Sequence, residues 1–469
     1  MTQDRYDLMV VGAGSGGLVA ARFAAKLGAR VALAEKNRIG GDCTWTGCVP
    51  SKALIKAAKI AHEVRTAAHY GVIASAPAVD MARVREYVHG AIEAVYQYET
   101  PEQLRAEGID VFLGGVRFAD AFTAVVGEHT VSSNAFLITT GARPLIPPIE
   151  GLNGVLFNTY ENVFENQVLP KTMAIVGGGP VGIEMAQAYQ RLGASVTVVA
   201  EHVLPKEDLD VQELMQGALE REGVRFVSGK ARRACKDGNG IVVATEHHEA
   251  RGEMLLVAVG RKPNLDGLDL EKAGVKHSPH SIPVDDQLRT NVKHVYAAGD
   301  VAGGHQFTHY AGWQAFQAAR NALLPGNSSG ITNVVPWVTF TDPEVAHVGL
   351  TEQRAVAQFG NDVRIHRWNM DHVDRAVCEN DTAGLIKIIA KADGSILGAT
   401  IVAARAGEAI VELIVAMKER MKLKDIAGAI HPYPTYTTAV QQMAADITVE
   451  HLLSGTSGKL IRGLSRIAR

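Results

Sequence analysis

Short apolar runs that lead into clusters of glycine occur twice along the chain. Residues 6–11 form the first run, and glycines, an alanine-rich helical stretch and a second apolar run at 30–34 follow it. The same layout returns between residues 173–176 and 195–199. Each copy predicts a strand–turn–helix–strand unit with a right-handed parallel crossover. Two copies in one chain predict two dinucleotide sites.

The pattern changes after the second copy. An apolar run at 295–298 leads into Gly299 and Asp300, and a linker rich in Pro, Gly and Ser occupies 325–330. Beyond the linker, strand patterns cover 336–349 and 385–401, and helical patterns cover 406–421 and 435–453. The predicted fold class is therefore α/β, with two Rossmann-like dinucleotide-binding domains and an α+β C-terminal domain.

Three glycines in the first copy have the spacing that a bound pyrophosphate requires. Gly12 permits the tight turn, Gly14 lets the backbone approach a phosphate at the helix N-terminus, and Gly17 allows close helix–strand packing. Glu35 ends the next predicted strand, where its carboxylate can accept hydrogen bonds from an adenosine ribose. This complete context favours a dinucleotide site over an incidental glycine-rich turn.

The second copy repeats the spacing with Gly177, Gly179 and Gly182. The position that matches the ribose-binding acid is Ala200, and Glu201 is displaced by one residue, which changes its face in a strand. A carboxylate nearby would still repel a 2′-phosphate, so the sequence favours NADH over NADPH. Two neighbouring basic residues favour the opposite choice: His202 and Lys206.

Cys43 and Cys48 form a close pair in a chain that has only four cysteines. Pro50 suits the first turn of a helix, so we expect Cys48 just before a helix N-terminus, with Lys52 one turn further on. The helix dipole and the cation would both favour a thiolate at Cys48. Cys43 can close a disulfide with it and open again. Since no further Cys or His ligand lies nearby, redox chemistry is favoured over a structural disulfide, and no metal site is predicted.

Composition excludes several other classes. A chain of 469 residues predicts about three domains, and a formal net charge of −3 offers no basic face for nucleic acid. Four cysteines are too few for a secreted disulfide scaffold. The sequence has no secretory leader and no apolar run of about 18 residues, so we expect no membrane span and a cytoplasmic location.

Taken together, the motifs resemble those of the pyridine nucleotide–disulfide oxidoreductases, the family of dihydrolipoamide dehydrogenase, glutathione reductase and mercuric reductase. The resemblance covers roughly residues 6–450. Its motifs are Gly-Ala-Gly-Ser-Gly-Gly at 12–17, Gly-Gly-Asp-Cys at 40–43, Gly-Cys-Val-Pro-Ser-Lys at 47–52, Thr-Thr-Gly-Ala-Arg-Pro at 139–144, Gly-Arg-Lys-Pro-Asn at 260–264, Ala-Gly-Asp at 298–300, Phe-Thr-Asp-Pro-Glu at 340–344 and Val-Gly-Leu-Thr-Glu at 348–352.

The resemblance implies a set of roles. FAD would bind the first glycine motif, with Asp300 at its ribityl–pyrophosphate region, and NADH or NADPH the second. Lys52 would lie at the flavin and pair with Glu184. Cys48 would be the charge-transfer thiol and Cys43 the interchange thiol. Three further residues in shared motifs are expected to contact the cofactors: Thr140, Gly141 and Gly260.

The resemblance also implies domain limits and a partner. The FAD-binding domain would comprise 1–149 and 276–335, the NAD(P)-binding domain 150–275, and the dimerisation domain 336–469. The last domain would form a two-fold homodimer in which the partner subunit completes each active site.

The segment 430–438 departs from the lipoamide and glutathione enzymes. Those relatives place a catalytic His before Pro-Thr and a Glu five residues later, where this chain has Tyr433 and Thr438. A tyrosine, with an ordinary pKa of about 10, is poorly matched to general-base work near neutrality. Mercuric reductases carry Tyr at this position, but they also have a C-terminal Cys pair, whereas this chain has no cysteine after Cys378. His431 is either a substitute base or a packed interface histidine.

Three functions stay open. The leading hypothesis is a mercuric reductase-like flavoprotein whose acceptor is a disulfide, a thiolate-bound metal ion or a quinone. The alternatives are a dihydrolipoamide dehydrogenase-like enzyme and a redox-sensing or electron-carrier flavoprotein. Trp45 and Trp313 either line a substrate surface or pack in a core. The basic stretch 459–469 has an amphipathic helical pattern, and we expect it to pack on the C-terminal domain; the alternative is a segment that touches an anionic surface or a partner.

Overall fold

The computed structural model describes residues 5–453 and residue 458, so the stretch 459–469 lies outside the described residues. The chain divides into two compact units. The first comprises the residues up to 201 and 223–332, and the second comprises 202–222 and the residues from 333 onward. The predicted α/β class is confirmed, whereas the finer domain limits stay predictions.

A five-stranded parallel sheet lies at the centre of the first unit, in the order β17-β7-β1-β2-β3. Its strands are β1 (Leu8–Val11), β2 (Val31–Glu35), β3 (Ile109–Leu113), β7 (Phe136–Ile138) and β17 (Val295–Ala297). Alternate residues of β1 enter two different cores, as the two-residue period of a strand requires. One core contains helices α1 (Ser15–Lys26) and α8 (Thr308–Leu323), and the other contains the meander of β4 (Val116–Asp120), β5 (Thr123–Val126) and β6 (His129–Ser132).

A second, four-stranded parallel sheet has the order β11-β10-β9-β15. Its strands are β9 (Thr172–Val176), β10 (Ser195–Ala200), β11 (Arg225–Ser228) and β15 (Met254–Val257), and α6 (Pro180–Leu192) joins β9 to β10. The meander of β12 (Arg233–Asp237), β13 (Gly240–Ala244) and β14 (Glu249–Gly252) shares a core with this sheet. Both copies of the predicted strand–glycine–helix–strand unit are therefore present.

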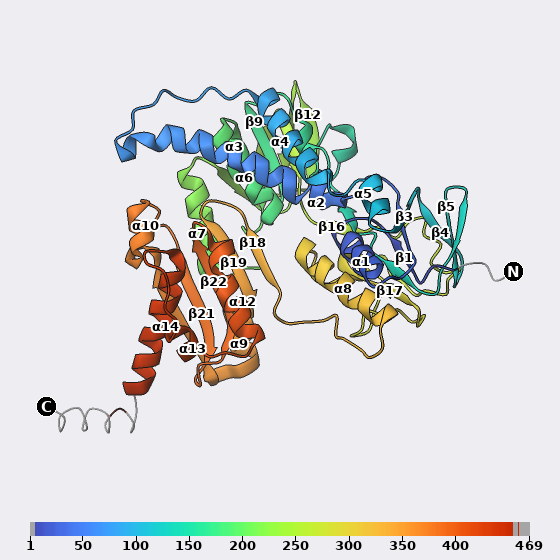
Figure 1. Cartoon of the computed structure of the whole chain (residues 1–469). Coiled ribbons are helices and arrows are strands. Elements are labelled where there is room, and N and C mark those ends of the chain that lie inside the picture. The colour runs from blue at the N-terminus through green and yellow to red at the C-terminus, as the bar shows by residue number, and fades with distance from the viewer. Residues whose placement is uncertain (1–4, 454–457, 459–469) are drawn as a thin grey trace. The chain divides into compact units, whose positions relative to one another are not determined.

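Within the first unit, α3 (Cys48–Thr66) packs against α6, the helix that follows the second glycine motif (Figure 1). Cys48 is the first residue of α3, with Gly47 as the N-cap, so the expectation that Cys48 precedes the helix was wrong by one position. Cys43 lies in α2 (Gly41–Trp45), a short helix that the sequence pattern did not predict. Two more helices follow in this unit: α4 (Met81–Tyr96) and α5 (Pro101–Ala106).

The second unit is built on a five-stranded antiparallel sheet, β18-β19-β22-β21-β20. Its strands are β18 (Pro336–Thr339), β19 (Glu344–Gly349), β20 (Val363–Asn369), β21 (Leu385–Lys391) and β22 (Ile396–Ala403). Its helices are α7 (Leu209–Arg221), α9 (Glu352–Phe359), α10 (Asp374–Cys378), α11 (Ala406–Ala409), α12 (Val411–Lys418), α13 (Leu423–Ala427) and α14 (Tyr436–Leu453). The single helix predicted at 406–421 is interrupted at Ile410, whose ψ of −20° is typical of a 3₁₀ turn. None of the helices in the described part of the chain is long and apolar enough to cross a membrane.

A buried lysine ties the start of α7 to the antiparallel sheet. Lys387 on β21 has a fully buried side chain, and its Nζ lies 3.1 Å from Asp208 Oδ2 and 2.5 Å from Asp210 Oδ1. Glu352 Oε2 lies 3.3 Å away, and Arg367 pairs with the same two outer carboxylates, Asp210 and Glu352. Burying an ammonium group is tolerated only when such partners offset the lost hydration.

We expect Lys387→Met to lower the free energy of unfolding by about 3 kcal/mol, because the substitution removes the cation from the nearly buried Asp208 and leaves Asp210 and Glu352 with Arg367 alone. The shift of the urea midpoint, followed by circular dichroism, measures the loss. The exposed Lys424→Met serves as the matched control and should change stability by less than about 0.5 kcal/mol. Equal midpoints for the two variants would contradict a stabilising role for Lys387.

Candidate active site

The first glycine motif leaves room for a dinucleotide at the middle glycine alone. A Cβ added at Gly12 would lie 2.5 Å from Thr139 O, and one at Gly17 would lie 1.8 Å from Gly12 O. At Gly14 the nearest atom would be 3.8 Å away. Gly14 is also the N-cap of α1 and offers no side chain to the first-turn amides. The site therefore fits the pyrophosphate of FAD, since open helix amides bind anions.

The second motif repeats the same division of roles. A Cβ at Gly177 would lie 2.3 Å from Ala258 O, and one at Gly182 would lie 2.1 Å from Gly177 O. A Cβ at Gly179 would meet nothing within 4 Å, and Gly179 is the N-cap of α6 without a side-chain cap. The backbone there is accessible to a second dinucleotide.

The two acids that the sequence singled out lie differently at the ends of their strands. Glu35 accepts a hydrogen bond from the amide of Ala13 at 2.7 Å and another from the amide of Asn37 at 2.7 Å, so its carboxylate is held beside the glycine turn. Glu201 follows β10, is half exposed, and lies 3.5 Å from Lys230 Nζ. The carboxylate of Glu201 is thus accessible to a ligand at the end of β10 and is paired with a cation.

Two motifs of the resemblance pair with each other. Strands β8 (Ala142–Pro144) and β16 (Arg261–Pro263) form an antiparallel ribbon directly after Gly141 and Gly260. The Thr140 hydroxyl donates to Asn264 O at 2.7 Å, and the Asn264 amide donates to Gly141 O at 3.0 Å. Thr140, Gly141 and Gly260 therefore lie at the connection between the two dinucleotide halves.

A cluster of charged side chains surrounds Arg261, which is partly buried. Its Nη1 lies 2.8 Å from Asp300 Oδ2, its Nη2 donates to Asp42, and its guanidinium covers the ring of Tyr160 at 5.3 Å. Burial raises the pKa of Asp300. The buried Nε of Arg261 has no hydrogen-bond partner among the described residues. An aspartate that is almost fully buried at the end of the first sheet fits a role in holding a polar part of FAD.

The two cysteines are free thiols joined by a hydrogen bond. That hydrogen bond is the main cause that lowers the pKa of Cys48 to about 6, and it raises the pKa of Cys43. Thr308 Oγ1, on the first residue of α8, lies 3.2 Å from Cys48 Sγ. The pair therefore holds its charge on Cys48 and its proton on Cys43.

Lys52 and Glu184 form the expected ion pair, with Nζ 2.9 Å from Oε2. Lys52 lies one turn after Cys48 on α3, and Glu184 lies on α6 with a buried side chain. The ion pair thus joins the helix that begins at Cys48 to the helix that begins at the second glycine motif.

Both tryptophans are packed in part by neighbouring rings. The Trp45 indole donates to Ile39 O at 2.7 Å and contacts the Tyr96 ring with centroids 4.9 Å apart. Trp313 stacks on Tyr310 and keeps 36% of its surface exposed. The single donor of Trp45 is satisfied, which favours packing at that residue.

In the second unit, Tyr433 and His431 take different partners. The Tyr433 hydroxyl donates to Asp374, and this hydrogen bond raises the pKa of Tyr433. The Nε2 of His431 lies 2.8 Å from Glu412 Oε1, and its Nδ1 lies 3.2 Å from Ala429 O. Both ring nitrogens of His431 therefore face acceptors of the protein itself, the Glu412 carboxylate and a backbone carbonyl.

Five residues that contact the expected site residues were not singled out as site residues from the sequence: Asp42, Arg261, Thr308, Asp374 and Glu412. Arg261 lay inside a quoted motif and Asp42 directly precedes Cys43, so both had a signal in the sequence. The other three come from distant segments and have no such signal. Among residues 5–453 and 458, no group of three or more His, Cys, Asp or Glu side chains could hold a metal ion.

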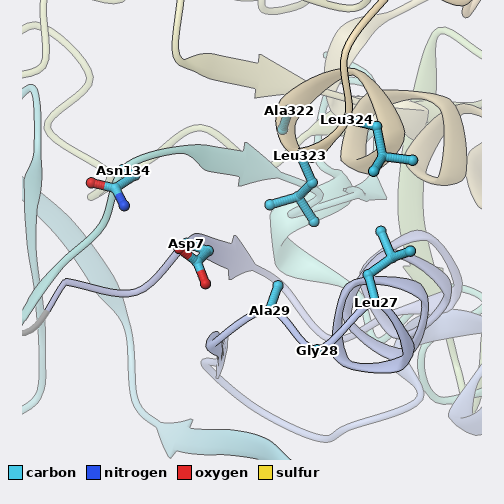
Figure 2. A pocket seen from close by; sticks show the side chains of 8 residues that line it. All are labelled: Asp7, Leu27, Gly28, Ala29, Asn134, Ala322, Leu323 and Leu324. Carbon is cyan, nitrogen blue, oxygen red and sulfur yellow. The ribbon is translucent and has the colours of Figure 1, made fainter.

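A hollow of about 390 Å³ is lined by eight residues, none of which is among the site residues described above (Figure 2). Asp7 precedes β1 and Leu27 follows α1, so the hollow lies at the edge of the first sheet opposite the glycine turn. The Asp7 carboxylate already accepts the amide of Arg30 at 2.8 Å. With no other ionisable side chain, the hollow has no reactive group.

Two dinucleotide folds beside a thiol pair define a two-cofactor oxidoreductase that works through a redox-active dithiol. The chain belongs to the pyridine nucleotide–disulphide oxidoreductase family, whose model matches residues 6–315, and the model of the family's dimerisation domain matches residues 335–444. The protein is therefore an FAD-dependent enzyme that uses NADH or NADPH.

Relatives of known function cover most of the chain. A mercuric reductase from Lysinibacillus sphaericus is 32% identical over 453 residues, which are 95% of this chain and 83% of the relative. Dihydrolipoyl dehydrogenase 2 from Haloarcula marismortui is 35% identical over 457 residues, covering 94% and 96%. The structure of the HOCl-induced flavoprotein disulfide reductase RclA from Escherichia coli matches with a TM-score of 0.85 at 27% identity, covering 94% and 99%.

Gly179→Ala tests the second glycine motif without disturbing the fold. Its φ of −76° suits alanine and the new methyl group would contact no protein atom, so only a bound dinucleotide would meet it. We expect FAD content to be unchanged and the Kd for NADH to rise on the order of tenfold, about 1.4 kcal/mol.

Gly90→Ala in α4 is the matched control, because a methyl group there also meets nothing within 4 Å. It should leave both cofactor affinities unchanged. Unaltered NADH affinity in Gly179→Ala would place the nicotinamide cofactor elsewhere.

Proposed function

We propose that the protein is a mercuric reductase-like enzyme that passes electrons from NADH to a soft metal ion bound by thiolates. Mercuric reductases are among the relatives that match most of the chain. The observation that carries the proposal is that both ring nitrogens of His431 contact acceptors of the protein, Glu412 and a backbone carbonyl. The residue that would otherwise serve as the acid–base catalyst for disulfides is thereby engaged in the protein.

The cofactors would be held by the residues that fit them. FAD would lie on Gly12, Gly14 and Gly17, with Glu35 at its ribose and Asp300 at its ribityl chain. When bound, FAD supplies a carrier of two electrons between the nicotinamide and the disulfide. The second motif would hold the nicotinamide cofactor through its own open helix N-terminus.

The thiol pair performs a balanced exchange. A hydride from the nicotinamide carries two electrons and one proton, and the Cys43–Cys48 disulfide needs both electrons and that proton to give one thiolate and one thiol. The hydrogen bond between the cysteines assigns the thiolate to Cys48 and the proton to Cys43. Cys43 would then be the thiol that exchanges with the acceptor, once it has lost its proton.

The choice of acceptor follows from the proton requirement. Reduction of a disulfide substrate needs a proton for a leaving thiolate, which a general acid normally supplies. Reduction of a mercuric ion to the metal consumes two electrons and no proton, since the thiolates are released as ligands. Tyr433 is a poor proton donor because its hydrogen bond to Asp374 raises its pKa, which suits the second reaction better.

An acceptor panel tests the proposal. NADH oxidation should be fastest with mercuric ion in the presence of excess thiol, and oxidised glutathione should be slower by on the order of 10²-fold or more. Cys43→Ser and Cys48→Ser should abolish the mercuric activity. If oxidised glutathione, lipoamide or a quinone is reduced faster than mercuric ion, that compound is the acceptor and the metal ion is not. If none of the acceptors is reduced, the protein is better explained as a redox sensor.

We infer that the enzyme prefers NADH and is a cytoplasmic homodimer. The dimerisation-domain match at 335–444 supports the dimer, and in it segment 430–438 would face the partner's thiol pair. The half-exposed carboxylate of Glu201 at the end of β10 supports the choice of NADH, because it would repel a 2′-phosphate.

Glu201→Gln should lower the ratio of kcat/KM for NADH over NADPH about tenfold, because the isosteric amide removes this repulsion. Steady-state kinetics with both nucleotides measures the ratio. Glu249→Gln, which neutralises an exposed acid on β14, is the control and should leave the ratio unchanged. A ratio unaffected by Glu201→Gln would remove Glu201 from nucleotide selection.

A further inference from the structure

We infer that Thr308 is a positioning residue that donates its hydroxyl hydrogen to the thiolate of Cys48 and so stabilises the negative charge on that sulfur in the reduced pair. The inference rests on the proposed assignment of Cys48 as the thiol beside the flavin. It goes further by naming the group that sustains the charge there.

The geometry brings one hydroxyl to the sulfur. Thr308 Oγ1 lies 3.2 Å from Cys48 Sγ although the two residues are 260 positions apart in the sequence. Each is the first residue of a long helix: Cys48 begins α3, of 19 residues, and Thr308 begins α8, of 16 residues. The sulfur therefore lies at two helix N-termini, where partial positive charge favours an anion.

The hydroxyl distinguishes the two ionisation states of Cys48. A thiolate can only accept hydrogen bonds, and the thiol of Cys43 and the hydroxyl of Thr308 are both donors. A protonated Cys48 would lose part of this interaction, because sulfur in a neutral thiol is a weak acceptor. A donor to the charged form favours ionisation, and charge-assisted hydrogen bonds are the stronger kind.

The cation that the sequence suggested is largely occupied elsewhere. Lys52 Nζ lies 2.9 Å from Glu184 Oε2, so the ammonium and the carboxylate act on Cys48 with opposite sign. The hydrogen bond from Cys43 lowers the pKa of Cys48 the most. The hydrogen bond from Thr308 lowers it more than the charge of Lys52 does, and burial of the sulfur raises it. The Thr308 hydroxyl, which touches the sulfur, therefore stabilises the thiolate, whereas the opposite charges of Lys52 and Glu184 largely cancel at Cys48.

Threonine also fixes the direction of its hydroxyl better than serine would. Its Cβ carries two heavy substituents, which restrict χ1. The hydroxyl of Thr308 is therefore held toward Cys48, and Cys43 lies within hydrogen-bonding reach of the same hydroxyl. Serine at this position should retain the hydrogen bond with a somewhat lower occupancy.

Thr308→Val removes the hydroxyl and keeps the shape. The holoenzyme is reduced anaerobically with NADH, and the long-wavelength charge-transfer band of Cys48 is followed as the pH is lowered. The band of the wild type should be lost near pH 6, from the pKa of Cys48. In Thr308→Val the midpoint should rise by about one unit, a roughly tenfold loss of thiolate below it.

Two control variants test whether the effect depends on the hydroxyl of residue 308 and on its position beside Cys48. Thr308→Ser should titrate close to the wild type. Thr46→Val makes the same substitution between the two cysteines, where the buried Thr46 hydroxyl has no hydrogen-bond partner among the described residues, and it should not move the midpoint. If Thr308→Val does not fold, Thr308→Ala should show the same rise.

A second measurement is the rate at which iodoacetamide alkylates Cys48 in the reduced holoenzyme, mapped by mass spectrometry at several pH values. The pH midpoint of this rate should move with the band. A wild-type midpoint in Thr308→Val, or equal shifts in Thr308→Val and Thr308→Ser, would overturn the inference and leave the proposed function intact. A band that persists in Cys48→Ser would instead overturn the assignment of the thiols, and the inference with it.

Discussion

The ion pair between Lys52 and Glu184 is the interaction on which the arrangement of the active site depends. It joins α3, which starts at a cysteine, to α6, which starts at the second glycine motif. Glu184 is buried, and a buried carboxylate without its cation costs several kcal/mol. The two helices are therefore held together by a charge that neither half can bury alone, and the thiol pair keeps its place between the two dinucleotide folds.

That constraint also explains why the charge on the thiol pair has local causes. A lysine committed to a carboxylate contributes a field that falls off quickly with distance, as for any opposed pair of charges. The thiol of Cys43, the hydroxyl of Thr308 and two helix N-termini act on Cys48 at contact distance instead. Burial opposes ionisation in the same place, so these contacts are required for a thiolate near neutral pH.

Sequence reasoning reached the parts of the site that depend on neighbours along the chain. The glycine turns, the helix that carries Cys48 and the parallel sheets follow from local spacing and hydrophobic period, and the family motifs supplied the pairing of Lys52 with Glu184. The contact of Thr308 with Cys48 depends on how α8 docks on the first sheet, and no local pattern encodes it. The partner of His431 was missed for the same reason, since Glu412 belongs to another helix.

The low pKa of Cys48 has a consequence for survival under oxidants. With a pKa of about 6, the thiol is mostly ionised at neutral pH, and the thiolate is the form that peroxides and hypochlorous acid attack. The sulfenic acid so formed would lie beside the thiol of Cys43, and the two would condense to a disulfide with loss of water. That disulfide is the same one the nicotinamide opens in turnover, so the ordinary reductive half-reaction would also repair the first oxidative lesion at Cys48.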